Sequence, residues 1–201
     1  MRGLLAEFGI TVAKGAAKLK AELPFILEDA ENELPDSVRG CLSDLQEELL
    51  HIKKKLNEID VKIQQVSQQN SLCQQLMTMP GIGPIIATIL YASMGDGNQF
   101  KNGRHFSAWL GIVPKQYITG DNPNLKGISK RGNAYLRKQL INGARSVITR
   151  VEKKNDRVSR WCQELKQRLP FNKAVVALAN KMARMAWAML NHNEDYKLKI
   201  A

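Results

Sequence analysis

The most regular feature of the chain is a set of apolar residues that recur at alternating intervals of three and four within a long polar stretch. This spacing is that of a coiled-coil heptad, so it predicts one long helix with an apolar seam. The alternation continues through Asn70 to Cys73 and Met77, where Asn70 would be a polar seam residue able to fix the register. The residues of the seam are Leu42, Leu45, Leu49, Ile52, Leu56, Ile59, Ile63 and Val66.

The charges beside the seam favour pairing between copies of the chain. With Leu42 at position a, Glu48 faces Lys53 of a parallel partner strand, and Lys55 faces Asp60 in the same way. Leucine at a with isoleucine at d favours more than two strands. A second interpretation stays open, in which the stripe forms an antiparallel hairpin with the C-terminal helices of the same chain.

Shorter helices are predicted on both sides of this stretch. Residues up to Glu33 are expected to form a short helical lead-in, which Pro35 ends. Seven glycines between residues 95 and 133 indicate a loop-rich region, with one short helix that packs Phe106 and Trp109 inward. Amphipathic spacing then predicts three helices, over 134–151, 158–169 and 171–189.

A glycine pair follows the predicted coiled coil. Gly81, Ile82 and Gly83 precede Pro84, which stands where a new helix would take its first residue. Glycines allow a tight turn with positive φ, and the free amides at a helix N-terminus favour an anion. We therefore interpret this segment as a helix-hairpin-helix that contacts DNA through Gly81, Ile82 and Gly83. The alternative is a plain turn between two packed helices.

Together these patterns predict an all-α fold. A long coiled-coil helix is followed by a compact helical domain, which opens with the helix-hairpin-helix and contains the glycine-rich loop region. The expected boundaries are a helical lead-in over 1–36, a coiled coil over 37–78 and a DNA-binding domain over 79–201.

Charge points to a nucleic-acid partner. The formal net charge is +11, and residues 97–201 hold 21 Lys and Arg against 6 Asp and Glu. Such a basic half attracts a polyanion, although a solvated basic face is the alternative. The three scattered cysteines indicate neither disulfides nor a zinc site. No apolar run is long enough for a membrane span and no signal peptide is visible, so we expect a cytoplasmic protein without a membrane partner.

Four ordered motifs span 80–84, 100–104, 108–114 and 127–137. Together they resemble the C-terminal transposase domain of the insertion sequence 110 family, a family with an acidic RuvC-like domain and a C-terminal serine domain. The segment from Arg2 to Gly9 is also similar to the part of that family that follows the RuvC-like domain.

The resemblance implies a DNA recombinase that excises and inserts circular elements, with element ends and target DNA as partners and a structured guide RNA as a further one. It implies that Mg²⁺ is bound by four carboxylates of the RuvC-like domain, which would precede Met1. We therefore expect this chain to hold no metal and no cofactor, to form homo-oligomers through the coiled coil, and to be inactive alone. Residues 1–36 would be the remnant after the missing domain.

The resemblance also places a nucleophile. The family serine corresponds to Thr119, whose β-branch crowds an in-line attack, and Ser129 is the alternative nucleophile. The residues expected to bind DNA near them are Arg104, Lys126, Lys130, Arg131, Asn133 and Arg137.

Two other functions compete with a transposase fragment. One is a non-catalytic DNA-binding or regulatory protein derived from a transposase, which the threonine in the serine position favours. The other is a helical scaffold whose basic half binds RNA without specificity.

Overall fold

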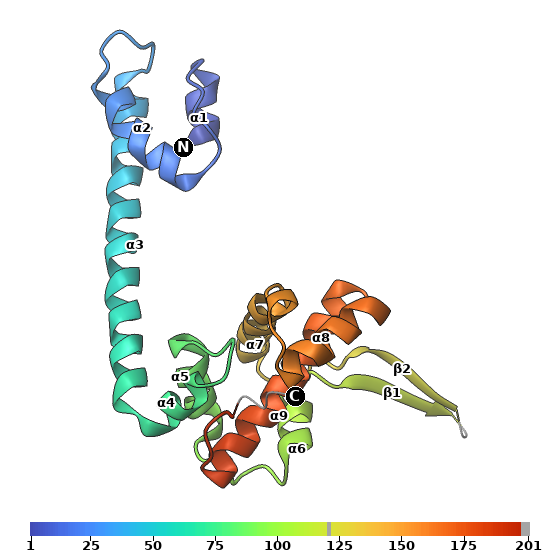
Figure 1. Ribbon diagram of the computed structural model, residues 1–201. Helices are drawn as coiled ribbons and strands as arrows, with labels where there is room; N and C mark the ends of the chain where they lie inside the picture. The colour runs from blue at the N-terminus through green and yellow to red at the C-terminus, as the bar shows by residue number, and fades with distance from the viewer. Residues whose placement is uncertain (120–121, 198–201) are drawn as a thin grey trace. The chain divides into compact units, whose positions relative to one another are not determined.

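The computed structural model describes residues 1–119 and 122–197, and of residues 118, 119, 122 and 123 it describes the backbone. The described chain is mostly helical, which confirms the all-α prediction, and its strands form one two-stranded sheet. The chain divides into two compact units, Met1–Val61 and Lys62–Ala201 (Figure 1). The predicted boundaries at 36 and 78 stay predictions.

The first unit is built by helices α1 (Arg2–Glu7) and α2 (Ala16–Glu28) and by the start of α3 (Asp36–Gln69). A small apolar core joins these helices, so the lead-in is a folded element and not a bare connection. Its buried side chains are Leu5, Val12, Leu23, Leu34 and Leu42.

Arg39 of α3 holds the turn that follows α2. Its Nη1 donates to the carbonyl oxygen of Leu27 at 2.8 Å, and its Nη2 donates to that of Asp29 at 2.7 Å. Its Nε donates to the carbonyl oxygen of Leu34 at 3.1 Å. The carbonyls at the end of α2 have no partner within the helix, so the guanidinium fork satisfies them and ties α2 to α3.

Helix α3 ends at Gln69, so the predicted continuation of the heptad helix through Asn70 to Met77 is wrong. Asn70 has extended backbone angles, and its side-chain oxygen accepts a hydrogen bond from the Cys73 amide at 3.0 Å. An asparagine competes for backbone donors in this way and favours a cap over a helix interior. Asn70 therefore caps α4 (Ser71–Met77) and does not fix a coiled-coil register.

Helix α9 (Phe171–His192) is the centre of the second unit. Helices α4, α6 (Gly103–Trp109), α7 (Ala134–Ile148) and α8 (Arg157–Arg168) all pack against it, and α5 (Pro84–Met94) packs against α4 and α7. The predicted C-terminal helices and the end of α8 before Pro170 are confirmed. Small and flexible residues lie along the buried side of α9, and they let several helices approach α9 closely. They are Ala174, Val175, Leu178, Ala179, Met182, Ala183, Ala186, Met189 and Leu190.

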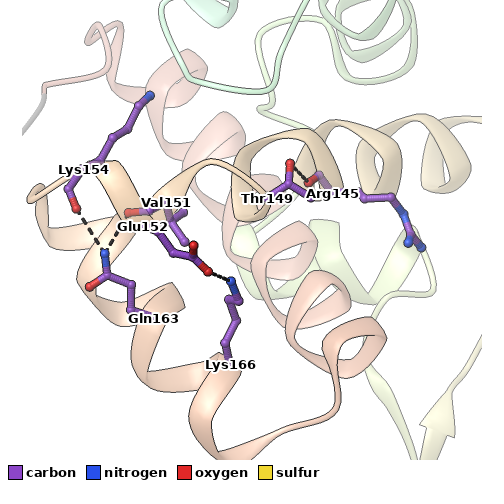
Figure 2. A network of polar contacts seen from close by, with 7 residues as sticks. All are labelled: Arg145, Thr149, Val151, Glu152, Lys154, Gln163 and Lys166. Atoms are coloured by element: carbon purple, nitrogen blue, oxygen red, sulfur yellow. Dashed lines mark hydrogen bonds and ion pairs between the residues drawn. The ribbon is translucent and has the colours of Figure 1, made fainter.

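A polar network fixes the connection from α7 to α8 (Figure 2). Nε2 of Gln163 donates to the carbonyl oxygen of Val151 at 2.7 Å, which secures the 3₁₀ turn η1 (Val151–Lys153) against α8. Lys166 pairs with Glu152 at 2.5 Å in the same place. These contacts lie on the surface, so they orient the connection more than they stabilise the unit.

The glycine-rich region contains an antiparallel hairpin that the sequence analysis treats as loop. Strand β1 (Pro114–Thr119) pairs with β2 (Asn122–Ile128), with Pro114 opposite Ile128 and Thr119 opposite Asn122 (Figure 1).

The short helix before this hairpin forms as expected, but one of its two aromatic residues does not point inward. Phe106 is fully buried, whereas Trp109 at the end of α6 is 39% exposed and stacks on Phe106 with ring centroids 6.0 Å apart. The prediction for Trp109 is therefore wrong, because a helix of two turns buries one side and leaves its last residue at the edge.

Candidate nucleic-acid interface

Two adjoining cavities lie between α6, the base of the hairpin and α9. One has a volume of about 1060 Å³ and the other of about 740 Å³. Both are lined by Arg104, Pro114, Asn180 and Arg184, so they form one continuous feature, which we call the α9 cleft. The larger cavity also contains Trp161 and Trp187, whereas the smaller one is mainly polar.

The α9 cleft is cationic. Its described lining includes no Asp or Glu, and none of its cations pairs with a carboxylate among residues 1–119 and 122–197. Unpaired cations that share a concave surface raise the local concentration of anions. The cations of the lining are Arg104, Lys115, Arg131, Lys173, Lys181 and Arg184.

Gly103 determines how closely α6 approaches α9 at this site. A Cβ on Gly103 would lie 2.9 Å from the carbonyl oxygen of Arg184 and 3.0 Å from its Cα. Only glycine permits this contact, so the N-terminus of α6 rests directly on α9. The contact brings Arg104 and Arg184 to the boundary that the two cavities share.

Lys181 is the most constrained cation of the cleft. Its ammonium lies 4.1 Å from the centroid of the Trp161 ring, a favourable cation–π geometry. Burial lowers the pKa of Lys181, and the charges of Arg157 and Arg184 lower it further against the opposing effect of Cys162. Burial in turn raises the pKa of Cys162 to about 11, so this thiol is an inert core group.

Ser129 lies at the base of the hairpin and lines the smaller cavity. Its amide donates to the carbonyl oxygen of Val113 at 2.8 Å. Its hydroxyl oxygen is buried and has no hydrogen-bond partner within the described part of the chain. A buried hydroxyl without a partner is costly unless a ligand or water satisfies it.

Thr119 lies at the other end of the ribbon from Ser129. Its backbone is opposite Asn122 in the register, and its side chain lies outside the described residues. Thr119 is five residue steps along β1 from Pro114, a distance of roughly 16 Å at about 3.3 Å per step. The expected neighbourhood of Thr119 with Lys130 and Arg131 is therefore wrong, because those residues follow the base of β2.

The glycine turn between α4 and α5 packs inward. Gly81 has φ +88°, and a Cβ there would lie 2.7 Å from Cγ2 of Val147 on α7. Ile82 is buried in the core, while Gly83 precedes α5 and has open space around it. The two glycines thus differ in their packing: close contact with α7 requires glycine at position 81, whereas no neighbouring atom requires it at position 83. Phosphate contact by this turn stays a prediction.

Two residues expected at the interface have structural partners. Asn133 caps α7, since its side-chain oxygen accepts from the Leu136 amide at 3.0 Å. Nη1 of Arg137 donates to the carbonyl oxygens of Leu110 at 3.0 Å and Arg131 at 3.2 Å, which fixes the crossing of these segments. Their contact with DNA stays a prediction.

The other expected cations are exposed. Lys126 lies over the Tyr117 ring at 4.9 Å, and Lys130 has a left-handed backbone with φ +56°. Arg104 and Arg131 belong to the α9 cleft.

The part of the cleft that α9 provides contains no residue predicted as a site residue from the sequence. Lys173, Asn180, Lys181 and Arg184 all lie on α9, where the apolar pattern draws attention to the opposite, buried face. The spacing of Lys173, Lys181 and Arg184 would have indicated a cationic face, because residues three, four, seven or eight apart share one side of a helix.

The part of the chain that the structure describes contains no group of three or more His, Cys, Asp or Glu residues able to hold a metal ion, and its cysteines are free. The described residues thus offer no cluster of ligands of the kind that Mg²⁺ needs. No described helix combines the length and the apolar character needed to cross a membrane.

Comparison with known proteins places residues 73–159 in the family model described as "Transposase IS116/IS110/IS902 family". Over 98% of the chain, the sequence is 41% identical to the transposase for insertion sequence element IS1111A of Coxiella burnetii, of which it covers 54%. It is 42% identical to the "Probable family 20 transposase" of Pseudomonas aeruginosa, covering 59% of that protein. The transposase for IS1328 of Yersinia enterocolitica is 36% identical, with 56% of it covered. The chain thus spans little more than half the length of these relatives.

Proposed function

The chain belongs to the IS116/IS110/IS902 family of transposases, and from this we propose that it binds the DNA of an insertion element during transposition. One observation carries the proposal. Six Lys and Arg side chains line the α9 cleft, none of them pairs with a carboxylate among the described residues, and the described lining contains no Asp or Glu. Phosphates supply most of the affinity of such a surface. The ends of the element and the target site are the DNA partners, and the resemblance adds a guide RNA.

Strand breakage and rejoining need more than these residues. The full-length family enzyme is expected to use Mg²⁺ for phosphoryl transfer, which clustered carboxylates hold. In this proposal an acidic RuvC-like domain supplies that cluster, which the described residues do not form. By the resemblance, Thr119 occupies the position of the family serine at the far end of the hairpin, and the cations at the base of the hairpin would bind more distant phosphates of the same DNA.

Homo-oligomers form through α3 in this proposal. The seam residues Leu45, Leu49, Ile52, Leu56 and Ile59 are 43–56% exposed, although they are large and apolar. Pairing of seams from two or more copies would remove these side chains from water.

The test is DNA binding by the whole chain, measured by fluorescence anisotropy with a duplex of the element end. We expect the affinity to fall by a factor on the order of 10³ between 50 and 200 mM salt if about six phosphates are neutralised. Changing Lys115, Lys126, Lys130 and Arg131 together to glutamine should lower both the affinity and the salt slope. A matched variant with Lys14, Lys18, Lys53 and Lys54 changed to glutamine controls for net charge. A flat salt response would refute the proposal.

A non-catalytic regulatory protein is the second candidate. The threonine at position 119 favours it, since the resemblance implies a serine at that position. Such a protein would bind element DNA equally well but would lower recombination by a full-length transposase, which separates the two functions in one assay.

A further inference from the structure

The two halves of the α9 cleft differ in chemistry. The larger cavity has mostly apolar walls, formed by Ile112, Trp161, Val176, Ala177, Met185 and Trp187. Cations stand at its edge, where Arg104 and Arg184 lead into the smaller cavity with Lys115, Arg131 and the unpartnered Ser129 hydroxyl. An apolar hollow therefore opens directly onto a cationic one.

Paired DNA does not match this combination. A duplex presents phosphates outward and keeps the faces of its bases stacked, so it would leave the apolar hollow empty. A phosphate in that hollow would lose its hydration without gaining partners. An unpaired nucleotide matches both halves, because its base offers an apolar π face and its phosphate offers charge.

Two side chains of the cleft, Lys181 in the larger cavity and Asn180 at the boundary, fit such a ligand in detail. Lys181 is held over the Trp161 ring, so a cation and an aromatic ring reach the apolar cavity together. Asn180 lines both cavities; its Nδ2 donates only a long bond of 3.4 Å to Ile112, and its Oδ1 accepts none from the described residues. Its carboxamide is thus able to pair with a base edge, as amide side chains do.

We propose that the α9 cleft binds an unpaired polynucleotide strand, with one base in the apolar cavity beside Trp161 and the adjacent phosphates at Arg104 and Arg184. The inference rests on the proposed function, and it adds that this surface holds a strand out of its duplex. Strand exchange requires such a state, because a strand must leave one partner before it joins another. DNA and RNA share the chemistry that the cleft recognises.

The experiment compares oligonucleotides on the whole chain by fluorescence anisotropy. The probes are oligothymidylate, oligouridylate of equal length, a mixed-sequence duplex, and oligothymidylate with abasic sites. Ala177→Phe fills the apolar cavity and leaves every charge in place. Arg184→Gln removes one phosphate partner, and Arg150→Gln, an exposed arginine that does not line the cleft, is its matched control. Thermal unfolding by circular dichroism verifies that each variant folds.

We expect Ala177→Phe to weaken oligothymidylate binding by about tenfold, as for the loss of one stacked base, and duplex binding by less than about twofold. Arg184→Gln should reduce the salt slope for the single strand by about 0.7, the value for one phosphate, and Arg150→Gln should not. Abasic sites should weaken binding to the normal chain but not to Ala177→Phe, because both changes remove the same contact. The tighter of the two homopolymers identifies the natural strand.

The inference would be overturned if the abasic sites and Ala177→Phe weakened oligothymidylate binding independently of each other. It would also be overturned if Ala177→Phe weakened duplex binding as much as oligothymidylate binding. If Ala177→Phe fails to fold, Ala188→Phe fills the same cavity from another position on α9. Duplex binding that persists while single-strand binding is insensitive to these variants refutes the inference alone. Loss of salt-dependent binding to every probe refutes the proposed function as well.

Discussion

Gly143 of α7 touches the backbone of Gly81: a Cβ on Gly143 would lie 2.2 Å from the carbonyl oxygen of Gly81. The contact is reciprocal, since a Cβ on Gly81 would lie 2.8 Å from the carbonyl oxygen of Gly143. Each glycine leaves the space that the carbonyl oxygen of the other occupies. The turn between α4 and α5 therefore packs on α7 with no side chain between the two backbones. The pair thus explains a glycine that looks like a DNA-binding signature in the sequence.

Gly143→Ala should destabilise the second unit by about 1–3 kcal/mol, because the added methyl group has no space and backbone must shift. The measurement is the free energy of unfolding in urea, followed by circular dichroism. Gly127→Ala is the control, since no atom lies within 4 Å of its added Cβ. Equal stability of the two variants would show that α7 and the turn separate easily.

Arg39→Lys should loosen the end of α2. A lysine cannot reach several carbonyls with one planar group, so the carbonyls of Leu27 and Asp29 lose charged donors. Hydrogen exchange of residues 26–34, measured by mass spectrometry, should become about tenfold faster, from a loss of roughly 1.5 kcal/mol. Arg2→Lys, at an exposed position, provides the comparison. Unchanged exchange over 26–34 would remove Arg39 from this role.

Asp156 should make α8 sensitive to acid. Burial raises the pKa of its carboxyl, but hydrogen bonds from the Ser159 hydroxyl and from the amides of Ser159 and Val158 outweigh burial and lower it overall. With a lowered folded pKa, its stabilisation is complete above the unfolded value of about 3.9 and is lost as pH falls through the folded pKa.

An NMR titration of the Asp156 carboxyl carbon measures this directly, and a midpoint at or above the ordinary value would contradict the assignment. Asp156→Ala should cost about 1 kcal/mol at neutral pH, as for the loss of a helix cap. Asp156→Asn keeps an accepting oxygen but no charge, so it should retain most of the cap and lose the acid dependence.

Leu49→Lys with Leu56→Lys should dissociate oligomers of the chain, because two charges in the seam of α3 would be buried against a partner. Light scattering should then give the monomer mass of 22.6 kDa. His51→Lys with Asn57→Lys adds the same charge at exposed positions of α3 outside the seam and should leave the mass unchanged. If the unmodified chain already has the monomer mass, the seam has no partner in solution.

Helices could be predicted from the sequence wherever one face is apolar, and α7, α8 and α9 follow their patterns closely. The prediction failed where a local contact outweighs the pattern. Asn70 fits a heptad by position, yet its side chain caps α4 and ends α3. The hairpin was also missed, because Pro114, Gly120 and Gly127 look like loop residues and the strands have no clean alternation.

The interface could be predicted only in part, for a geometric reason. Net charge identifies the basic half, but it does not say which cations meet. Arg104 and Arg184 are 80 positions apart by their numbers and come together because Gly103 lets α6 rest on α9. Conversely, Thr119 and Arg131 are near in sequence but lie at different ends of the ribbon, since their separation depends on strand register.

Two hydroxyl groups, those of Thr119 and Ser129, are the candidate nucleophiles. The Ser129 hydroxyl oxygen is buried at the base of the hairpin, so an in-line attack on a phosphodiester would first require its exposure. By the resemblance, Thr119 is expected to stand in the position of the family serine, with one additional methyl group on its Cβ. We therefore expect Thr119 to provide the attacking oxygen and Ser129 to support the cleft.

In a recombination assay with an acidic domain from an active relative fused ahead of Met1, Thr119→Ser should raise activity and Thr119→Ala should abolish it. Ser129→Ala should retain activity within about tenfold, since it removes at most one hydrogen bond in the cleft. Anisotropy with the element-end duplex shows whether any loss arises from binding instead of chemistry. Activity of Thr119→Ala equal to that of the threonine form, together with an inactive Ser129→Ala that still binds DNA, would reverse the two roles and require the hairpin base to open during the reaction.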